Sequence, residues 1–254
     1  MAKSREIECV YVDKEKYKKR DRKITAFVSF LKKNEIKFEL CERKIIDGYV
    51  SSSGENAGTT HGGVIAFAGE RKYSDVEEIL DVCRRENGFC IYLDGAEDPF
   101  NLGYAERALY ASGASGLILP DTVRNGASAV LARSSAGASE LMKVARFSGS
   151  SSREMRLWLV EKAKERGITV CCAAVCKDSV SLFDYDAGFP ALVFIGGEKR
   201  GISPEFVENA DRIVHIPYAS SDIRFSLPTA TVAALFGFEL MRHRRENSKN
   251  ESID

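Results

Sequence analysis

Residues 191–204 read ALVFIGGEKRGISP, an unbroken apolar run followed by a glycine-rich loop and a proline. The run Ala191–Gly196 has the length of a strand and no polar residue, which is typical of a strand buried on both faces of a parallel sheet. The loop Gly196–Pro204 then leads into a short helix predicted at Pro204–Asn209. A strand that passes through a loop into a helix is the unit from which α/β folds are built.

The same alternation extends on both sides of this stretch, from Phe89 onward. The predicted strands are Phe89–Asp94, Ser115–Leu119, Ile168–Ala174 and Ile213–Ile216, and the predicted helices are Leu102–Ser112, Glu154–Arg166 and Thr229–His243. Apolar strands that alternate with helices predict an α/β fold, with a parallel sheet covered on both faces.

The N-terminal part predicts a smaller α/β unit. Its expected elements are a helix at Lys14–Lys33, strands at Ile36–Ile46 and His61–Gly69, a polar loop at Ser51–Thr60 and a helix at Ser74–Glu86. The regular alternation of strands and helices begins near residues 86–89, where we place the domain boundary. The predicted domains are therefore 1–86 and 87–245, followed by a polar tail at 246–254.

Composition excludes several classes of protein as leading ideas. The 254 residues are 44% hydrophobic and 29% charged, as in ordinary globular proteins. No apolar run approaches the ~18 residues that a membrane span needs, and the N-terminus has no apolar stretch typical of a signal peptide. Seven cysteines without CxxC spacing and three histidines predict reduced thiols and no metal site. We expect a cytoplasmic protein.

Net charge is zero, but residues 1–45 hold 14 Lys and Arg against 8 Asp and Glu, a local net charge of +6. Such a patch can attract phosphate groups. A solvated helix face explains the same charges, and charge alone favours that simpler interpretation.

Three loops follow predicted strands, at the edge where parallel α/β sheets bind ligands. They are DGAEDPFNLG at Asp94–Gly103, GGEKRGISP at Gly196–Pro204 and IPYASSDIRFSLP at Ile216–Pro228. A phosphate-binding P-loop is excluded because Ile202 stands where lysine is required, and no GxGxxG follows a strand. Taken singly, each loop is explained by turn-forming residues.

Together, the three loops resemble the motifs of the SpoU (TrmH-type) branch of the SPOUT methyltransferases, which are S-adenosylmethionine-dependent RNA ribose 2′-O-methyltransferases. The matching residues are Asp98, Pro99, Asn101, Leu102, Gly103 and Arg107 in the first motif, Gly196, Glu198 and Gly201 in the second, and Ile216, Pro217, Ser226 and Leu227 in the third. Pro228 stands where the family has asparagine. Arg133–Ser139 and His61–Val64 also resemble family segments, so the resemblance spans about residues 9–244.

The resemblance implies a deep trefoil knot in the C-terminal part, a homodimer and an RNA-binding N-terminal domain. It implies a cofactor pocket lined by Gly196, Ile216 and Leu227, largely through main-chain groups. It also implies that the catalytic residues are Arg107, Asn101, Glu198 and Ser226. A guanidinium resists deprotonation, so we interpret Arg107 as a positioning and electrostatic group rather than a base.

Each of these residues also has a purely structural interpretation. Asn101 or Ser226 could cap the helix that follows, Glu198 could be a first-turn charge, and Arg107 could be a surface arginine. His61 could contact RNA or hold a turn.

The predicted function is S-adenosylmethionine-dependent methylation of a ribose 2′-hydroxyl in structured RNA, with ribosomal RNA preferred over transfer RNA. The alternative is a non-catalytic RNA-binding protein of the same fold, disabled by Pro228. Proline is tolerated where a helix begins, so the fold should survive it and only an amide side chain is lost. An unrelated nucleotide-binding enzyme is disfavoured because both nucleotide fingerprints are missing.

Overall fold

The computed structural model describes residues 5–52, 61–96, 98–123, 128–197, 201–220, 222 and 225–250, with side chains as far as 247. The chain divides into two compact units after Lys72. This division lies earlier in the chain than the boundary predicted at 86–89. The helix at residues 76–85 belongs to the second unit because Ile79, Leu80 and Cys83 on its buried face pack against the parallel sheet.

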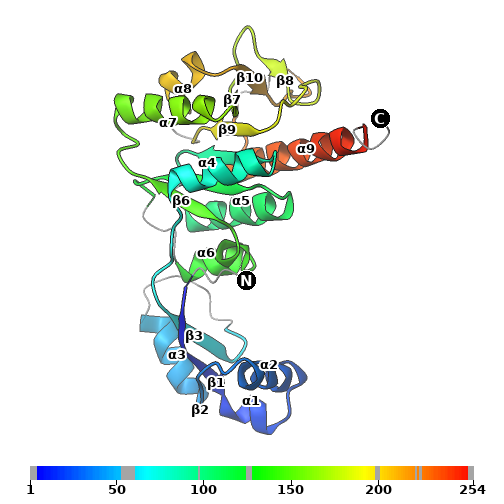
Figure 1. The fold of residues 1–254 in the computed structure, drawn as a ribbon. Helices are drawn as coiled ribbons and strands as arrows, with labels where there is room; N and C mark the ends of the chain where they lie inside the picture. Colours follow the sequence, from blue (N-terminus) through cyan, green and yellow to red (C-terminus); the bar gives the residue numbers. More distant parts are fainter. Residues whose placement is uncertain are drawn as a thin grey trace. The chain divides into compact units, whose positions relative to one another are not determined.

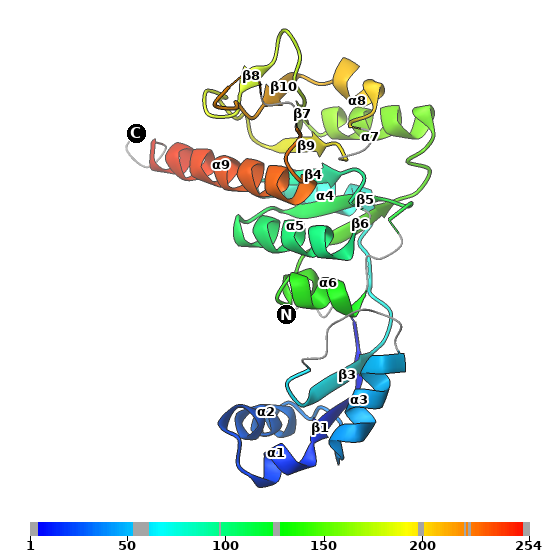
Figure 2. The same ribbon diagram turned by 180° about the vertical axis from the view of Figure 1, so that it is seen from behind.

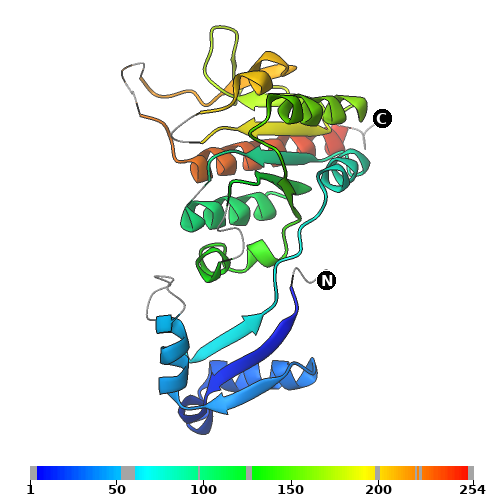
Figure 3. The same ribbon diagram turned by 90° about the vertical axis from the view of Figure 1, so that its left-hand side faces the viewer.

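The first unit contains a three-stranded sheet in the order β2-β1-β3, in which β1 pairs parallel with β2 and antiparallel with β3. Its elements are β1 (Ile7–Asp13), α1 (Lys14–Lys18), α2 (Arg22–Lys33), β2 (Phe38–Cys41), α3 (Arg43–Ser52) and β3 (Val64–Ala68) (Figure 1). Val10 and Val12 of β1 form a small core with Ile24, Val28 and Leu31 of α2. Helix α3 lies on the other side of the sheet from α2 (Figure 3).

Two elements of this unit differ from the prediction. The helix predicted at 14–33 is broken because Asp13 and Asp21 each start a helix by accepting main-chain N–H groups, and Arg20 between them has a φ of 53°. The strand predicted at 36–46 ends at Cys41, and α3 follows because helical spacing buries Ile46 against the sheet. Residues 53–60 of the predicted loop lie outside the described residues.

The second unit contains a seven-stranded sheet in the order β6-β5-β4-β9-β7-β10-β8. Its strands are β4 (Phe89–Leu93), β5 (Gly116–Pro120), β6 (Val144–Phe147), β7 (Thr169–Ala173), β8 (Val180–Ser181), β9 (Ala191–Ile195) and β10 (Arg212–His215). Its helices are α4 (Val76–Arg85), α5 (Pro99–Ala111), α6 (Ala129–Ser134), the 3₁₀ turn Ala138–Glu140, α7 (Arg153–Glu165), α8 (Pro204–Glu208) and α9 (Thr229–Asn250). Every neighbouring pair of strands is parallel, which confirms the predicted α/β class.

Helices cover both faces of this sheet. Helices α5, α6 and α9 share one buried cluster with the strands, and α4, α7 and α8 share the other. Helices α5 and α9 lie side by side (Figures 1 and 2). All five residues of β9 are buried, as expected for a strand covered on both sides. The trefoil knot that the resemblance implies stays a prediction.

The predicted tail begins as helix rather than as a separate segment. Helix α9 continues to Asn250, supported by ion pairs from Arg242 to Glu239 and Glu246 at helical spacing. Among the described residues, no helix is long and apolar enough to cross a membrane.

Candidate cofactor pocket and active-site residues

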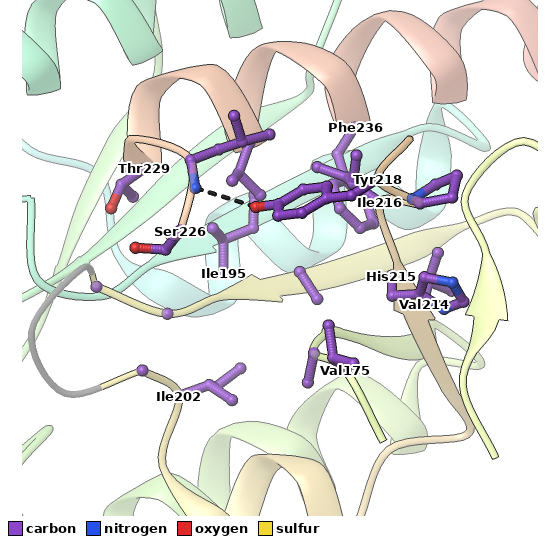
Figure 4. Close-up of a pocket in the computed structure, with 18 of the residues that line it drawn as sticks. Val175, Ile195, Ile202, Val214, His215, Ile216, Tyr218, Ser226, Thr229 and Phe236 are labelled. Atoms are coloured by element: carbon purple, nitrogen blue, oxygen red, sulfur yellow. Dashed lines mark hydrogen bonds between the residues drawn. The ribbon is translucent and has the colours of Figure 1, made fainter. Parts of the chain in front are cut away.

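A cavity of about 700 Å³ opens where β7, β9 and β10 end, beside the first turns of α9 (Figure 4). Its volume falls in the range of small-molecule sites. Its walls are mainly apolar, with Ile195, Ile202, Ile216 and Phe236 among the described lining residues. Apolar walls at the carboxyl ends of parallel strands suit a flat, partly apolar ligand such as a nucleoside.

The structure brings four predicted site residues together around this cavity. Gly196, Ile216 and Leu227, which were predicted to contact the cofactor, all line it, and so does Ser226. Residues 196 and 216 directly follow β9 and β10, and residue 227 precedes α9, so three different elements supply them. Glu198 lies outside the described residues.

Glycine is required in this wall because main chains approach each other closely. A Cβ on Gly196 would lie 2.3 Å from the carbonyl carbon of Gly201 and 2.4 Å from the nitrogen of Ile202. A Cβ on Gly95 would lie 2.7 Å from the Cα of Gly197, so the loops after β4 and β9 also touch. Two main-chain hydrogen bonds between Gly197 and Gly201 close the second loop. The glycines of the first two loops therefore lie against each other, and those of the second loop line the cavity.

The third loop enters α9 at Pro228. The carbonyl of this proline accepts hydrogen bonds from the nitrogens of Thr231 and Val232, so Pro228 occupies the position just before the helix. Ser226 lies two residues further out and is exposed, so the capping role considered for it is not found. Proline costs no helical hydrogen bond here, because its missing N–H would have had no partner in the helix.

Helix α5 carries the other two predicted catalytic residues. It begins because Asp98 accepts hydrogen bonds from the nitrogens of Phe100 and Asn101, which gives the capping role to Asp98 rather than to Asn101. Asn101 is half-buried and Arg107 is exposed. Neither belongs to the described lining of the cavity. Helix α5 nevertheless packs along α9, whose first turns do line it.

The segment Arg133–Ser139, which was matched to the family, fixes the start of α5. Gly103 lies against it so closely that a Cβ would be 1.8 Å from the hydroxyl oxygen of Ser134. That hydroxyl donates to the carbonyl of Pro99. The first motif therefore needs glycine at 103 to bring α5 against this segment.

Sequence reasoning missed several residues of the cavity. Tyr218 lines it, and so do Val175 and Phe225, whose exposed fractions are 85% and 68%. These are the two most exposed large apolar side chains in the described part of the chain, and both lie at the cavity. Tyr218 and Phe225 are the aromatic residues of the loop IPYASSDIRFSLP, and this aromatic content is the signal that could have found two of them.

The buried cysteines near this site are not nucleophiles. Burial raises the pKa of the Cys171 thiol in β7 to about 12 and also raises the pKa of Cys172, so both stay protonated at neutral pH. All seven cysteines are free thiols, and six are buried. No group of three or more metal-ligating side chains occurs in the part of the chain that the structure describes.

His61, in the first unit, has a structural role. Its Nδ1 accepts a hydrogen bond from the nitrogen of Gly63, so its Nε2 carries the proton and donates to Asp47 at 2.8 Å. The imidazole thus links the turn before β3 to α3. Its side chain is 6% exposed, which leaves little surface for RNA.

Comparison with known proteins then assigns the family. Residues 88–235, more than half of the chain, match the model of the SpoU rRNA Methylase family. The chain belongs to this family. It is therefore an RNA methyltransferase of the SpoU type, and the resemblance drawn from the three motifs is confirmed.

Relatives of this SpoU methylase cover most of its length. YacO of Bacillus subtilis (strain 168), named for the TrmH family of tRNA/rRNA methyltransferases, is 29% identical over 222 residues, which are 85% of this chain and 82% of YacO. The 23S rRNA (guanosine-2'-O-)-methyltransferase RlmB of Shewanella oneidensis is 28% identical over 228 residues, or 89% of this chain and 86% of RlmB.

Solved structures share the fold of this SpoU methylase. The SpoU methyltransferase AviRb from Streptomyces viridochromogenes aligns with a TM-score of 0.73 at 22% identity, covering 96% of this chain and 84% of AviRb. A second structure of AviRb, in complex with AdoMet, aligns with a TM-score of 0.72 at 21% identity, covering 95% of this chain and 85% of AviRb.

Proposed function

We propose that this protein is an RNA (ribose-2'-O)-methyltransferase that uses S-adenosylmethionine and acts on ribosomal RNA in preference to transfer RNA. The observation that carries the proposal is that Gly196 of the second motif and Ile216, Ser226 and Leu227 of the third line one apolar cavity. AviRb, of the same fold, is described in complex with AdoMet. The relative RlmB is named for 2'-O-methylation of guanosine in 23S rRNA, which supports both the hydroxyl and the RNA class.

The cavity fits S-adenosylmethionine on its own geometry. The close approach of Gly196 to Gly201 leaves main-chain groups rather than side chains at the end of β9, where an adenosine could reach them. Bound there, the cofactor supplies a methyl group that is already activated by the sulfonium. The protein's part is then to orient the ribose hydroxyl toward that methyl group. In well-aligned systems, orientation lowers the activation barrier by about 7–11 kcal/mol.

Arg107 is the residue we assign to the RNA side of the reaction. It is exposed on α5, and it has no hydrogen bond or ion pair within the described part of the chain. Its guanidinium group carries a fixed charge and planar hydrogen-bond donors. These suit a phosphate of the RNA, or the ribose hydroxyl as that hydroxyl loses its proton. Asn101 and Ser226 complete the proposed catalytic set, together with Glu198.

The alternative is an RNA-binding protein of the same fold that has lost catalysis through Pro228. The structure favours activity, because Pro228 starts α9 with its carbonyl in normal helical use. Only the amide side chain of the family asparagine is missing, while Arg107, Asn101 and Ser226 are present.

The proposal is tested with tritiated S-adenosylmethionine and unmodified bacterial ribosomal and transfer RNA, followed by nucleoside analysis. Label in a 2'-O-methylnucleoside of ribosomal RNA is the expected result. Label only in a methylated base, or only in transfer RNA, would contradict the proposal. Transfer by Pro228→Asn with none by the wild type would establish the non-catalytic alternative.

RNA binding by the first unit is supported by cations of α2. Arg22 and Lys23 are exposed in the first turn of α2, where positive charge opposes the helix dipole. They therefore do not stabilise the helix, which favours a role in binding. Phe30 is 53% exposed and stacks on Phe27 at 6.4 Å between ring centroids, which offers a surface for an unpaired base. A cytoplasmic location, where ribosomal RNA is found, is part of this proposal.

The double variant Arg22→Gln, Lys23→Gln should bind ribosomal RNA about tenfold more weakly at 0.15 M salt, because two phosphate contacts are lost. The slope of log affinity against log salt should become shallower by about 2. Filter binding across a salt series measures both quantities. The matched control, Arg84→Gln, Arg85→Gln, removes two exposed helical charges from α4 and should change neither. Equal losses in both variants would contradict the assignment.

We also propose a homodimer, on the evidence of exposed apolar side chains on the adjacent helices α5 and α9. Tyr104 on α5 and Phe238 on α9 are 51% and 45% exposed. Buried between two copies, such side chains would stabilise the association.

Sedimentation should therefore give twice the chain mass for the wild type, and Phe238→Glu should shift the protein to monomer at micromolar concentration, because a carboxylate would be buried. Phe30→Glu, at a similarly exposed phenylalanine of the first unit, should remain dimeric. A monomeric wild type would refute the dimer.

A further inference from the structure

Tyr218 ties the two ends of the third loop together. It lies two residues after Ile216, at the β10 end, and its phenolic oxygen accepts a hydrogen bond of 3.2 Å from the nitrogen of Leu227, near α9. The dashed line in Figure 4 marks this bond, which joins two residues of the cavity wall. One side chain therefore holds the opposite ends of the loop at the cavity.

The donor in this bond has a particular place in the loop. Pro228 has no N–H, and its carbonyl is already used by the first turn of α9. Leu227 therefore carries the last main-chain donor before the helix. The Tyr218 phenol engages that donor from within the loop, so Leu227 is held in place on the cavity wall.

We propose that Tyr218 is a positioning residue that sets the affinity of the cavity for S-adenosylmethionine. The inference rests on the proposed function, in which this cavity holds the cofactor. A loop whose ends are already joined loses less conformational entropy when a ligand binds. The smaller entropy loss makes binding tighter. Tyr218 is a lining residue missed by the sequence motifs, and none of the proposed catalytic residues performs this task.

The Tyr218 hydroxyl can also donate a hydrogen bond. In the Tyr218–Leu227 bond the oxygen accepts, so its own proton is not used, and it has no acceptor among the described residues. The side chain is 39% exposed and lines the cavity, so a bound molecule can reach it. An acceptor atom of the adenosine is the chemical group that this proton fits.

The test is Tyr218→Phe, which keeps the ring and removes only the hydroxyl. Titration calorimetry with S-adenosylmethionine, without RNA, should show a Kd about three- to tenfold higher than that of the wild type, the effect of one lost hydrogen bond. In RNA methylation the KM for the cofactor should rise by the same factor, with kcat at saturating cofactor unchanged within about twofold.

The matched control is Tyr110→Phe, which removes a hydroxyl from an exposed tyrosine of α5 that does not belong to the described lining. Its Kd should equal that of the wild type. Thermal unfolding without cofactor should give similar midpoints for all three proteins, which excludes a general loss of structure. A Kd for Tyr218→Phe equal to that of the wild type overturns the inference. A lower Kd overturns it too, because the phenol would then compete with the cofactor.

These outcomes separate the inference from the proposed function. If Tyr218→Phe weakens cofactor binding but the wild type methylates no RNA, the positioning role stands and the methyltransferase reaction fails. If the wild type methylates RNA and the variant binds cofactor equally well, the reaction stands and the positioning role fails.

Discussion

Arg107→Ala is expected to lower kcat for methyl transfer by about 10²–10³-fold while the Kd for S-adenosylmethionine changes by less than about twofold, the scale seen when one preorganised electrostatic donor is removed. Arg107 is exposed, and it does not belong to the described lining of the cavity. Its charge is therefore free for the RNA rather than for the cofactor. The reaction rate and calorimetric binding measure the two effects separately.

Two companion variants make this prediction specific. Arg107→Lys keeps the charge but loses the planar pair of donors, so its rate should lie between those of the wild type and the alanine variant. Arg85→Ala removes an exposed arginine from α4 and should leave the rate unchanged. An equal loss of cofactor affinity and rate in Arg107→Ala would instead place this arginine in the cofactor site.

The motifs could be recognised from sequence because backbone geometry leaves few residue types for each position. Gly196 has main-chain atoms of the adjoining loop where a Cβ would be, and Gly103 has Ser134 there. Asp98 caps the start of α5, and Pro99 occupies the first turn of the helix. Each requirement restricts its position to one or two residue types, so it is visible in a single sequence.

Features that depend on tertiary packing were harder to predict. The apolar residues Ile45 and Ile46 suit a strand as well as a helix, and only the sheet beneath α3 decides between them. Helix α4 precedes the change in rhythm at residues 86–89, yet its apolar face packs on β4 and β5, which places it in the second unit. The role of Tyr218 was not predicted because its hydrogen bond with Leu227 joins residues nine positions apart in an irregular loop.

Gly196→Ala is expected to abolish measurable cofactor binding, a loss of about 100-fold or more. The added Cβ would lie 2.3 Å from one main-chain atom and 2.4 Å from another, and neither can move aside as a flexible side chain would. Either β9 or the loop closed by Gly197 and Gly201 must shift, and both form the cavity wall. Overpacking of this kind also costs about 1–3 kcal/mol of folding stability.

Gly48→Ala is the comparison variant, and its expected effect on folding stability has the opposite sign. Gly48 lies in α3, where a Cβ would meet nothing within 4 Å. Alanine there should stabilise the protein by up to about 1 kcal/mol through helix propensity, with cofactor affinity unchanged. Denaturant unfolding and calorimetry of both variants test the pair. Gly196→Ala with wild-type affinity would mean that the cofactor does not bind against the end of β9, and the proposed site would have to be moved.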